Sequence, residues 1–441
     1  MSSQLITAFM FSTMMVLLLT GQRVFGVIGF VGAAAALWLW GEGAFEIPFN
    51  ASFQVLNWYP LITVPFFVFM GYMLSDSGIA GNLYRMFHVW FGPIQGGLAL
   101  GTIGLMVLVA AMNGLSVAGM AIGATIALPE LLRRGYDKVM ITGVIQGGSS
   151  LGILIPPSVV LVLYAMIARQ PVLQLWLAGV LPGLMMATIF SIYIYARCWL
   201  QPGLGPALPP EERAEITWGE RFSLLAQGLL PLAIFGTMMG LFLTGITSLV
   251  ESSAVGAALA TVATVVTGRF NRHVLEETTR KTLSVSCMFL WIIQAALCFS
   301  AVYDGLGAIR AIEGLLLGTW ELDPWTILIL MLVSFLLLGT FLDDTAMLVI
   351  VAPLYIPLVV KLGFNPIWFG ILYTMTCQIA YITPPFGYNL FLMRALAPPE
   401  ISLIDIYRSI VPFVALMILS MIIIMAFPGI ALWLPDLYSG R

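Results

Sequence analysis

One long apolar run follows another along the chain, and this spacing constrains the fold more than any other feature. The runs lie near residues 4–20, 24–40, 58–75, 96–132, 138–168, 172–197, 228–248, 250–268, 282–300, 325–360, 366–396 and 404–427. A helix needs about 20 apolar residues to cross a bilayer, and in hydrocarbon its backbone groups must pair within the segment. Only 9% of the residues are charged, against about 25% in soluble domains. The sequence therefore predicts an all-α polytopic membrane protein.

Two of the runs, 96–132 and 325–360, are too long for one span and contain a polar interruption. These interruptions read MNGLSVAG at 112–119 and GTFLDDTA at 339–346. Each run is either one kinked helix or a hairpin that enters and leaves the membrane on the same side. With hairpins and an external N-terminus, 14 of the 18 Lys and Arg residues fall on the inner side, as the positive-inside rule requires. This count favours two re-entrant helical hairpins.

An internal repeat relates the two hairpin regions at an offset of 228 residues. Pro156 and Pro157 align with Pro384 and Pro385, and LPELLRRGYD at 128–137 aligns with IPLVVKLGFN at 356–365. The predicted topology places an odd number of crossings between the copies, which inverts the second one. Inverted repeats with discontinuous helices are typical of secondary transporters. The alternative is chance recurrence of proline and glycine, which are common in membrane helices.

In the first copy, the stretch GGSSLGILIPPS at 147–158 interrupts an otherwise apolar span. Adjacent prolines end a helix because they lack N–H donors and clash with the preceding turn. The freed carbonyls and the serine hydroxyls are oxygen ligands suited to a small cation, while the next helix N-terminus favours an anion. The alternative is a packing kink. The groups of interest in this copy are Asn113, Gly114, Ser116, Ser149, Ser150, Gly152, Pro156, Pro157 and Ser158.

The second copy repeats this arrangement in TMTCQIAYITPPFGYN at 374–389, and its tip carries an aspartate pair. Acidic side chains deep in an apolar region are costly and mark a candidate site. The alternative is that the tip reaches water and the pair is solvated. The groups of interest are Gly339, Asp343, Asp344, Thr345, Thr376, Gln378, Thr383, Pro384, Pro385, Gly387 and Asn389.

Several function classes lack the residues they need. The chain has two histidines, four cysteines without ligand spacing and no G-x-x-x-x-G-K-[ST] loop. We therefore expect no enzyme activity, no ATP hydrolysis, no cofactor and no metal other than a coupling ion. A channel would not need two copies of a hairpin. Residues 81–92 suit either an interfacial helix or a plain amphipathic connector.

The motifs GSSLGILIPPS (148–158), RRGYD (133–137), LAGVLPG (177–183), FLDDTA (341–346) and ITPPFGYNLF (382–391) resemble those of one transporter family. This family is the large membrane subunit of TRAP transporters, the tripartite ATP-independent periplasmic transporters. The resemblance implies an inner-membrane, elevator-type permease for organic acids with a carboxylate. It also implies Na+ as coupling ion and two partners: a small four-helix membrane subunit and a periplasmic substrate-binding protein.

The resemblance also assigns residues to sites. One sodium site would use Asn113, Gly114, Ser116, Ser149, Ser150 and Gly152, and the other Gly339, Asp343, Thr345, Thr376, Thr383 and Gly387. Substrate would lie near Ser158, Asn389, Pro156, Pro157, Pro384 and Pro385. The first tip departs from the family pattern because SVAGMAIG contains no acid, and Asp344 stands where relatives often have proline.

The expected organisation alternates fixed and moving parts. Residues 1–92, 172–322 and 401–441 are expected to form the scaffold, with an N-terminus on the periplasmic side. Residues 93–171 and 323–400 are expected to form the two halves of the transport domain. The alternative function is a stand-alone elevator-type symporter for anions or dicarboxylates that needs no binding protein.

Overall fold

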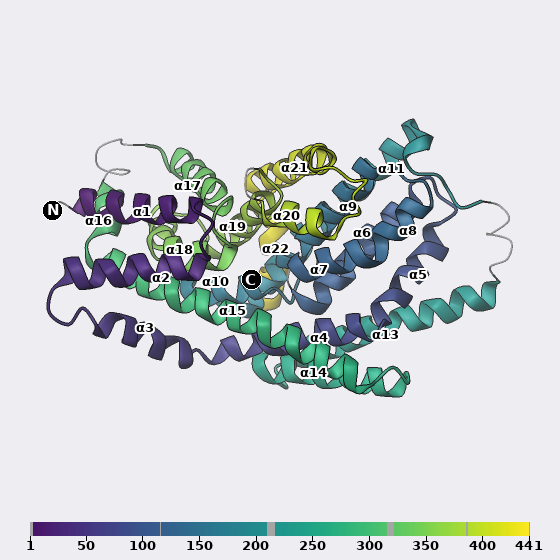
Figure 1. Cartoon of the computed structure of the whole chain (residues 1–441), viewed down its shortest axis with the longest axis horizontal. Helices are drawn as coiled ribbons and strands as arrows, with labels where there is room; N and C mark the ends of the chain where they lie inside the picture. The colour runs from purple at the N-terminus through teal and green to yellow at the C-terminus, as the bar shows by residue number, and fades with distance from the viewer. Residues whose placement is uncertain (1–2, 115, 210–216, 315–321, 385–386, 441) are drawn as a thin grey trace.

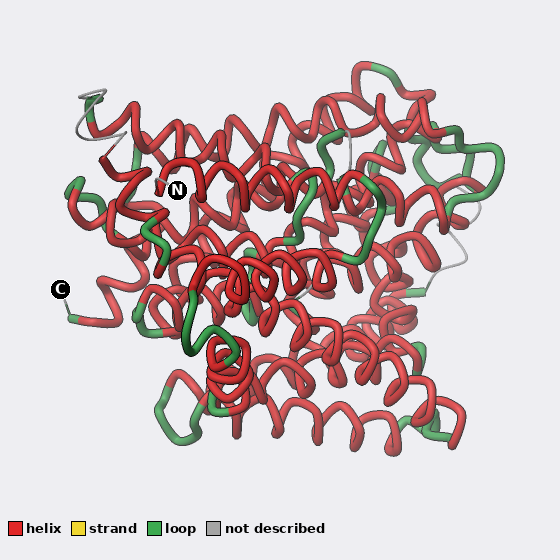
Figure 2. The backbone as a smooth tube through the Cα atoms, turned by 60° about the vertical axis from the view of Figure 1, so that its left-hand side comes forward, coloured by secondary structure: helices red, strands yellow, loops and turns green. Residues whose placement is uncertain are grey.

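The computed structural model describes residues 3–114, 116–209, 217–314, 322–384 and 387–440. These residues form helices and connecting loops, and Figure 2 shows no strand among them, which confirms the all-α prediction for this part of the chain. The helices are α1 (Ser3–Leu19), α2 (Val24–Ala35), α3 (Glu46–Leu56), α4 (Thr63–Asp76), α5 (Ile79–Phe91), α6 (Gly97–Asn113), α7 (Ser116–Ile122), α8 (Leu128–Arg133), α9 (Lys138–Ser150), α10 (Val159–Ala168), α11 (Val172–Leu200), α13 (Trp218–Leu243), α14 (Leu249–Val266), α15 (Arg272–Gly305), α16 (Ala308–Glu313), α17 (Pro324–Gly339), α18 (Asp344–Lys361), α19 (Pro366–Tyr381), α20 (Tyr388–Leu396), α21 (Leu403–Ala426) and α22 (Gly429–Ser439).

Five described helices are long and apolar enough to cross a membrane: α11, α13, α14, α15 and α21. Two bent pairs raise this number to seven if each pair counts as one span. In one pair, α3 meets the segment that contains α4 at 62°, and in the other α18 bends by 58°. The apolar run at 58–75 predicted α4 but not α3, because α3 mixes Asn50, Ser52 and Gln54 with its apolar side chains.

The first half of the repeat is a helix pair followed by a broken helix. The chain turns at Gly114 after α6 and returns through α7, a π-helical turn at Gly123–Ala127 and α8, ending at Arg133. After a short turn α9 begins, capped by the Asp137 carboxylate, which accepts from the Met140 N–H at 2.8 Å. Helix α9 ends at Ser150, and α10 begins at Val159, so the break lies between these two residues.

The second half reproduces these boundaries 228 residues later. Its return helix α18 spans Asp344–Lys361, matching the start of α7 and the end of α8, and α19 starts at the position equivalent to the start of α9. Asn365 caps α19 as Asp137 caps α9. Gly135 and Gly363, with φ of 75° and 82°, make the same left-handed turn before the cap. The predicted repeat is therefore present in the backbone as well as in the sequence.

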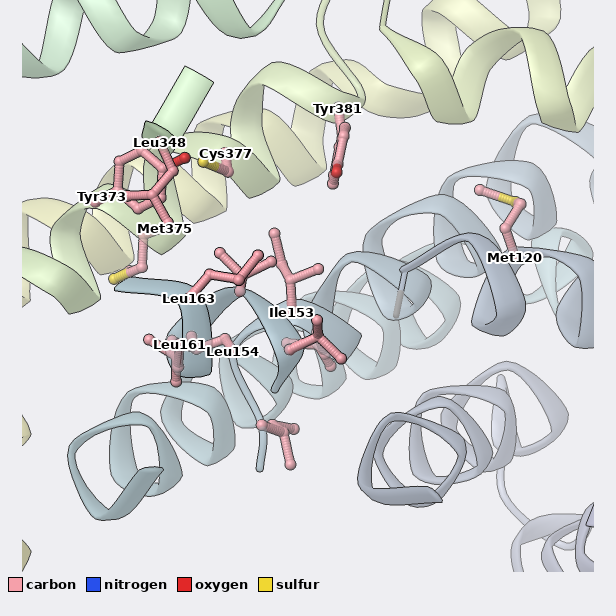
Figure 3. Close-up of a cluster of buried hydrophobic side chains, with 14 of the residues drawn as sticks. Met120, Ile153, Leu154, Leu161, Leu163, Leu348, Tyr373, Met375, Cys377 and Tyr381 are labelled. Carbon is pink, nitrogen blue, oxygen red and sulfur yellow. The ribbon is translucent and has the colours of Figure 1, made fainter. Parts of the chain in front are cut away.

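The two halves interlock. The tip helix of the first half, α7, packs against the post-break helix of the second half, α20, and in the same way α18 packs against α10. Figure 3 shows side chains from both halves in one buried cluster, with Leu161 and Leu163 of α10 beside Leu348 of α18 and Tyr373 of α19. Each tip therefore rests on the other half rather than only on its own.

The remaining helices pack outside this double unit. Figure 1 shows α15 running across the molecule, with α3 and α14 below it and the hairpins and broken helices above it. Helices α2, α3 and α4 pack against α15, and α14 packs against α4. A Cβ on Gly32 would lie 2.9 Å from the Phe299 Cα, so α2 and α15 approach closely there. Lys281 of α15 pairs with Asp76 of α4 at 2.8 Å. This arrangement leaves one side of the hairpin unit facing α2 and α15.

Candidate ion and substrate site

The first tip rests directly on the first break. Gly114 has a φ of 64°, and a Cβ placed on it would lie 1.9 Å from the carbonyl oxygen of Pro157. Farther along the return arm, a Cβ on Gly119 would lie 3.5 Å from the Cα of Ser149. Only glycine permits both the left-handed turn and this backbone approach at the tip. Asn113 ends α6 beside this contact.

The first break is held by its own polar groups. Pro156 and Pro157 are joined by a cis peptide bond. Ser158 caps α10 by accepting from the Leu161 N–H at 3.2 Å, and its hydroxyl donates to the Ile153 carbonyl. The Ser158 carbonyl in turn accepts from Nε1 of Trp176 at 3.2 Å. These bonds hold Ser158 at the break, and its predicted contact with substrate stays a prediction.

Three polar side chains meet where α20 crosses the first tip. Nδ2 of Asn389 donates to Oγ of Ser116 at 2.8 Å and to Oγ of Ser149 at 3.4 Å. All three residues are buried, and Oδ1 of Asn389 has no hydrogen-bond partner among the described residues. We call Ser116, Ser149 and Asn389 the first-tip cluster. The two serines were expected in the sodium site and Asn389 beside substrate, and the structure brings them together.

The second tip carries its acids at the start of α18. Asp343 is the N-cap and accepts from the Ala346 N–H at 2.8 Å. Asp344 is buried, its Oδ1 accepts from the Thr345 hydroxyl at 3.2 Å, and its carbonyl accepts from the Tyr373 hydroxyl at 2.6 Å. The helix N-terminus favours negative charge at this position. The acids are thus fixed by backbone and neighbouring hydroxyls.

The repeat makes the two tips comparable residue by residue. At the offset of 228, Ser116 corresponds to Asp344, Ser149 to Cys377 and Asn389 to Leu161. The first-tip cluster is therefore neutral and built from hydroxyls and an amide, while its counterpart is acidic. Cys377 is buried, and sequence reasoning treated it as a small apolar residue. The repeat offset was the signal that could have placed it next to the second tip.

Other predicted residues of the second half lie around this tip with differing orientations. A Cβ on Gly339 would lie 2.7 Å from the Cβ of Ala380, so the tip packs tightly on α19. The Gly387 N–H donates to the Thr383 carbonyl at 3.1 Å, which shapes the second break. Thr376 instead faces α21, with its hydroxyl 3.6 Å from Sδ of Met421. Pro384 is exposed, and Pro385 lies outside the described residues.

The supporting serine and glycine of the first break are also buried. Ser150 donates its hydroxyl to the Gly147 carbonyl at 2.7 Å, and its own carbonyl accepts from Nε2 of Gln378 at 2.9 Å. Gly152 lies in the 3-10 turn that follows α9. Both oxygens of Ser150 are therefore engaged in holding the break. The sequence marked Gln378 as an extra polar group of the second copy but assigned it to no site.

A cavity of about 610 Å³ lies between the second tip and the helices α2 and α15. Asp343 and Asp344 line it from the tip, Val117 from α7 and Tyr388 from the start of α20. On the other side, residues of α2 and α15 line the cavity, together with Arg23, the N-cap of α2. The cavity thus meets both tips, the second break, α2 and α15.

The site offers two kinds of binding chemistry. Carboxylate, hydroxyl, amide and carbonyl oxygens suit a hard cation. The N-terminal ends of α7, α18 and α20 and the Arg23 guanidinium suit an anion. Among the described residues, no group of three or more His, Cys, Asp or Glu side chains is placed to hold a metal ion. The arrangement therefore places oxygen ligands for a cation and positive groups for an anion around one cavity.

The fold is that of a polytopic membrane transporter. It aligns with the crystal structure of the Alcanivorax borkumensis YdaH transporter at a TM-score of 0.64, with 14% identity, covering 88% of this chain and 90% of that one. At this identity the similarity concerns the fold.

The chain belongs to the family described as tripartite ATP-independent periplasmic transporter, DctM component, which it matches over residues 11–430. It is 30% identical to the C4-dicarboxylate TRAP transporter large permease protein DctM of Pseudomonas aeruginosa, covering 87% of this chain and 88% of the relative. It is 28% identical to the ectoine/5-hydroxyectoine large permease UehC of Ruegeria pomeroyi, covering 98% and 100%. The family predicted from the sequence is confirmed, and the chain is the large permease subunit, a multi-pass membrane protein.

Proposed function

We propose that this permease takes up an organic acid by secondary active transport coupled to Na+. The two relatives described above are named for a C4-dicarboxylate and for ectoine or 5-hydroxyectoine. Both substrates carry a carboxylate, so the proposal extends that shared group to the substrate of this chain. The particular acid is selected by the binding protein that delivers it.

The observation that carries the proposal is the interlocking of the two tips around one cavity. Asn389 of the second half hydrogen-bonds the first tip, while α10 of the first half supports α18 at the second tip. A cation bound at either tip would therefore order groups from both halves. A symporter requires that cation binding favour substrate binding. A bound cation that orders the cavity wall does this, because a disordered wall binds substrate weakly.

The proposed ion sites follow the two tips. At the first, Ser116, Ser149 and the unpaired Oδ1 of Asn389 supply neutral oxygens, together with backbone groups near Gly114. At the second, Asp343 supplies a carboxylate. The first site is neutral, so it leaves no uncompensated buried negative charge when it is empty. At the second site, the carboxylate compensates the charge of the bound cation.

The proposed substrate site is the cavity beside the second tip. Tyr388 of α20 lines it, and no described side chain caps the N-terminus of that helix at Gly387. An uncapped helix N-terminus presents backbone N–H groups to a carboxylate. Arg23 adds a guanidinium from the scaffold. Sodium at Asp343 would remove the repulsion that this carboxylate exerts on an anionic substrate.

The proposed mechanism is an elevator in the inner membrane. The hairpins and broken helices form one interlocked unit that meets α2 and α15 across the cavity. We propose that this unit slides along the scaffold with its cargo, and that the N-terminus lies on the periplasmic side. The family is described as tripartite and periplasmic, so the proposed partners are a small membrane subunit and a periplasmic binding protein.

Reconstitution tests the proposal. The complete complex in proteoliposomes, supplied with the loaded cognate binding protein, should accumulate substrate when sodium is higher outside. A pH gradient at equal sodium should drive little uptake. Uptake driven by pH alone would contradict the sodium coupling, and equal uptake without the binding protein would favour the stand-alone symporter.

A further inference from the structure

Two residues at the same position of the two repeats hydrogen-bond each other. Nε2 of Gln378, on α19, lies 2.9 Å from the carbonyl oxygen of Ser150, the last residue of α9. Their separation of 228 residues equals the repeat offset. A residue contacts its own repeat equivalent only close to the axis that relates the halves. The bond between Gln378 and Ser150 therefore lies at the centre of the double unit.

The accepted carbonyl is one that loses its α-helical partner at the break. In a continuous helix, the Ser150 carbonyl would accept from the Leu154 N–H, but that N–H donates to Leu151 instead, as does the N–H of Ile155. Both Gln378 and Ser150 are completely buried. Ser150 is also the N-cap of the 3-10 turn Leu151–Ile153, so the amide of Gln378 binds α9 at the residue where its α-helical bonding ends.

The residues adjoining this bond lead to the first proposed ion site on one side and to the cavity beside the second on the other. Ser149, next to Ser150, accepts from Asn389 in the first-tip cluster. Cys377, next to Gln378, is the repeat equivalent of Ser149, and Tyr381 one turn later lines the cavity with Asp344. A shift of the Ser150 carbonyl would move Ser149 on one side and the last turn of α19 on the other.

We propose that Gln378 is a positioning residue that couples the two ion sites. Sodium bound at the first tip fixes Ser149 and Ser150. The hydrogen bond from the Gln378 side chain to Ser150 then also orders α19, so sodium binding at the second site loses less conformational entropy. By linkage, the second sodium favours the first equally. This inference rests on the two sodium sites of the proposed function, and it assigns their cooperativity to one side chain.

A second glutamine provides a matched control. Gln146 is also completely buried, lies one turn before Ser150 on α9, and likewise has an Oε1 without a partner among the described residues. Its Nε2 donates at 3.1 Å to Ser409 of α21, which is not part of the other repeat half. Methionine is similar in size to glutamine, so each replacement removes one buried amide and nearly preserves the side-chain volume. Only the change at Gln378 also removes the hydrogen bond between the two halves.

The test is a sodium titration of the full-length chain in nanodiscs, with choline keeping the ionic strength constant, followed by tryptophan fluorescence and thermal unfolding. In the wild type we expect a Hill coefficient approaching 2, the number of proposed sites. Gln378→Met should lower it to about 1 and raise the half-saturating sodium concentration roughly tenfold, within the usual range of coupling between sites. Gln146→Met should change the unfolding temperature but keep the wild-type Hill coefficient.

A conservative variant adds a rescue. In Gln378→Glu, the protonated carboxyl can donate to the Ser150 carbonyl while the carboxylate cannot, so cooperativity should return as pH falls, with wild type measured in parallel. Equal Hill coefficients in wild type and Gln378→Met, or an equal loss in Gln146→Met, would overturn the coupling alone. A wild-type chain that responds identically to sodium and choline would overturn the sodium sites and the coupling together.

Discussion

The side-chain amide of Asn389 lies 2.8 Å from Oγ of Ser116, so a residue beyond the second break closes onto the first residue of the first tip helix. Asn389→Ala should leave both hydroxyls of the first-tip cluster without this donor and remove the unpaired Oδ1. We expect the free energy of sodium binding to weaken by about 1.5 kcal/mol, which is roughly a tenfold loss of sodium affinity. Sodium titration of the purified chain measures it, and an unchanged titration would remove Asn389 from the ion site.

The two adjacent serines of the first break should respond differently to alanine. Oγ of Ser149 accepts from Asn389, whereas the Ser150 hydroxyl only donates back to Gly147, and its contact with the other half uses the backbone carbonyl. Back-bonding of a serine hydroxyl within its own helix contributes little stability. We expect Ser149→Ala to abolish most sodium-driven uptake and Ser150→Ala to reduce it less than about twofold.

The double variant Ser149→Ala with Ser150→Ala should match the single change at Ser149. Uptake into proteoliposomes, normalised to inserted protein, provides the comparison. A larger loss from Ser150→Ala than from Ser149→Ala would mean that the Ser150 hydroxyl, and not its carbonyl, carries the function.

The sequence predicted the parts of the fold that depend on local chemistry. Double prolines, capping residues such as Asp137 and Asn365, and turn glycines such as Gly135 act through neighbouring backbone, so their positions could be inferred from the pattern. The helix boundaries of the two halves consequently agree at one offset. The short amphipathic helix α3 was missed because its polar positions interrupt the apolar run.

Contacts between distant segments could not be inferred in the same way. Asn389 lies 273 residues from Ser116, and nothing in either local sequence indicates that they meet. Thr376 shows a second limit. The motif places it on α19 but does not determine which way its side chain points, and in the structure its hydroxyl points toward Met421 of α21. Which side chains converge depends on the packing of the two halves, and the repeat offset carries only part of that information.

Gly114 at the first tip should tolerate no side chain. It combines a φ of 64° with a Cβ position only 1.9 Å from the Pro157 carbonyl oxygen. Gly135 is the matched control, since its φ is 75° but a Cβ there would meet nothing within 4 Å. Gly135→Ala should therefore cost only the left-handed strain, about 1–2 kcal/mol.

Gly114→Ala should cost the same strain and also push the tip away from the break. If the tip relaxes outward, the unfolding temperature should fall by a similar amount in the two variants. Sodium-driven uptake should fall at least tenfold in Gly114→Ala alone. Equal uptake by both variants would show that the contact between the first tip and Pro157 is dispensable.

Asp343 should contribute charge in addition to its capping bond. Its carboxylate accepts from the Ala346 N–H, and asparagine caps helices about as well as aspartate. Asp343→Asn should therefore keep α18 in place while removing the negative charge from the cavity wall. We expect the half-saturating sodium concentration to rise several-fold to about tenfold, with protein yield nearly unchanged, because interactions with a charged group contribute about 1.5–3 kcal/mol against about 1 kcal/mol for a neutral one.

Asp323 supplies the control for this prediction. It caps the neighbouring helix α17 by accepting from the Thr326 N–H at 3.1 Å, and that bond is exposed. Asp323→Asn is the same chemical change at a cap outside the cavity, so the sodium titration should stay at the wild-type value. Because both variants preserve an N-cap, a sodium affinity lowered equally in the two would assign the effect to hairpin stability, whereas a loss confined to Asp343→Asn assigns it to the ion.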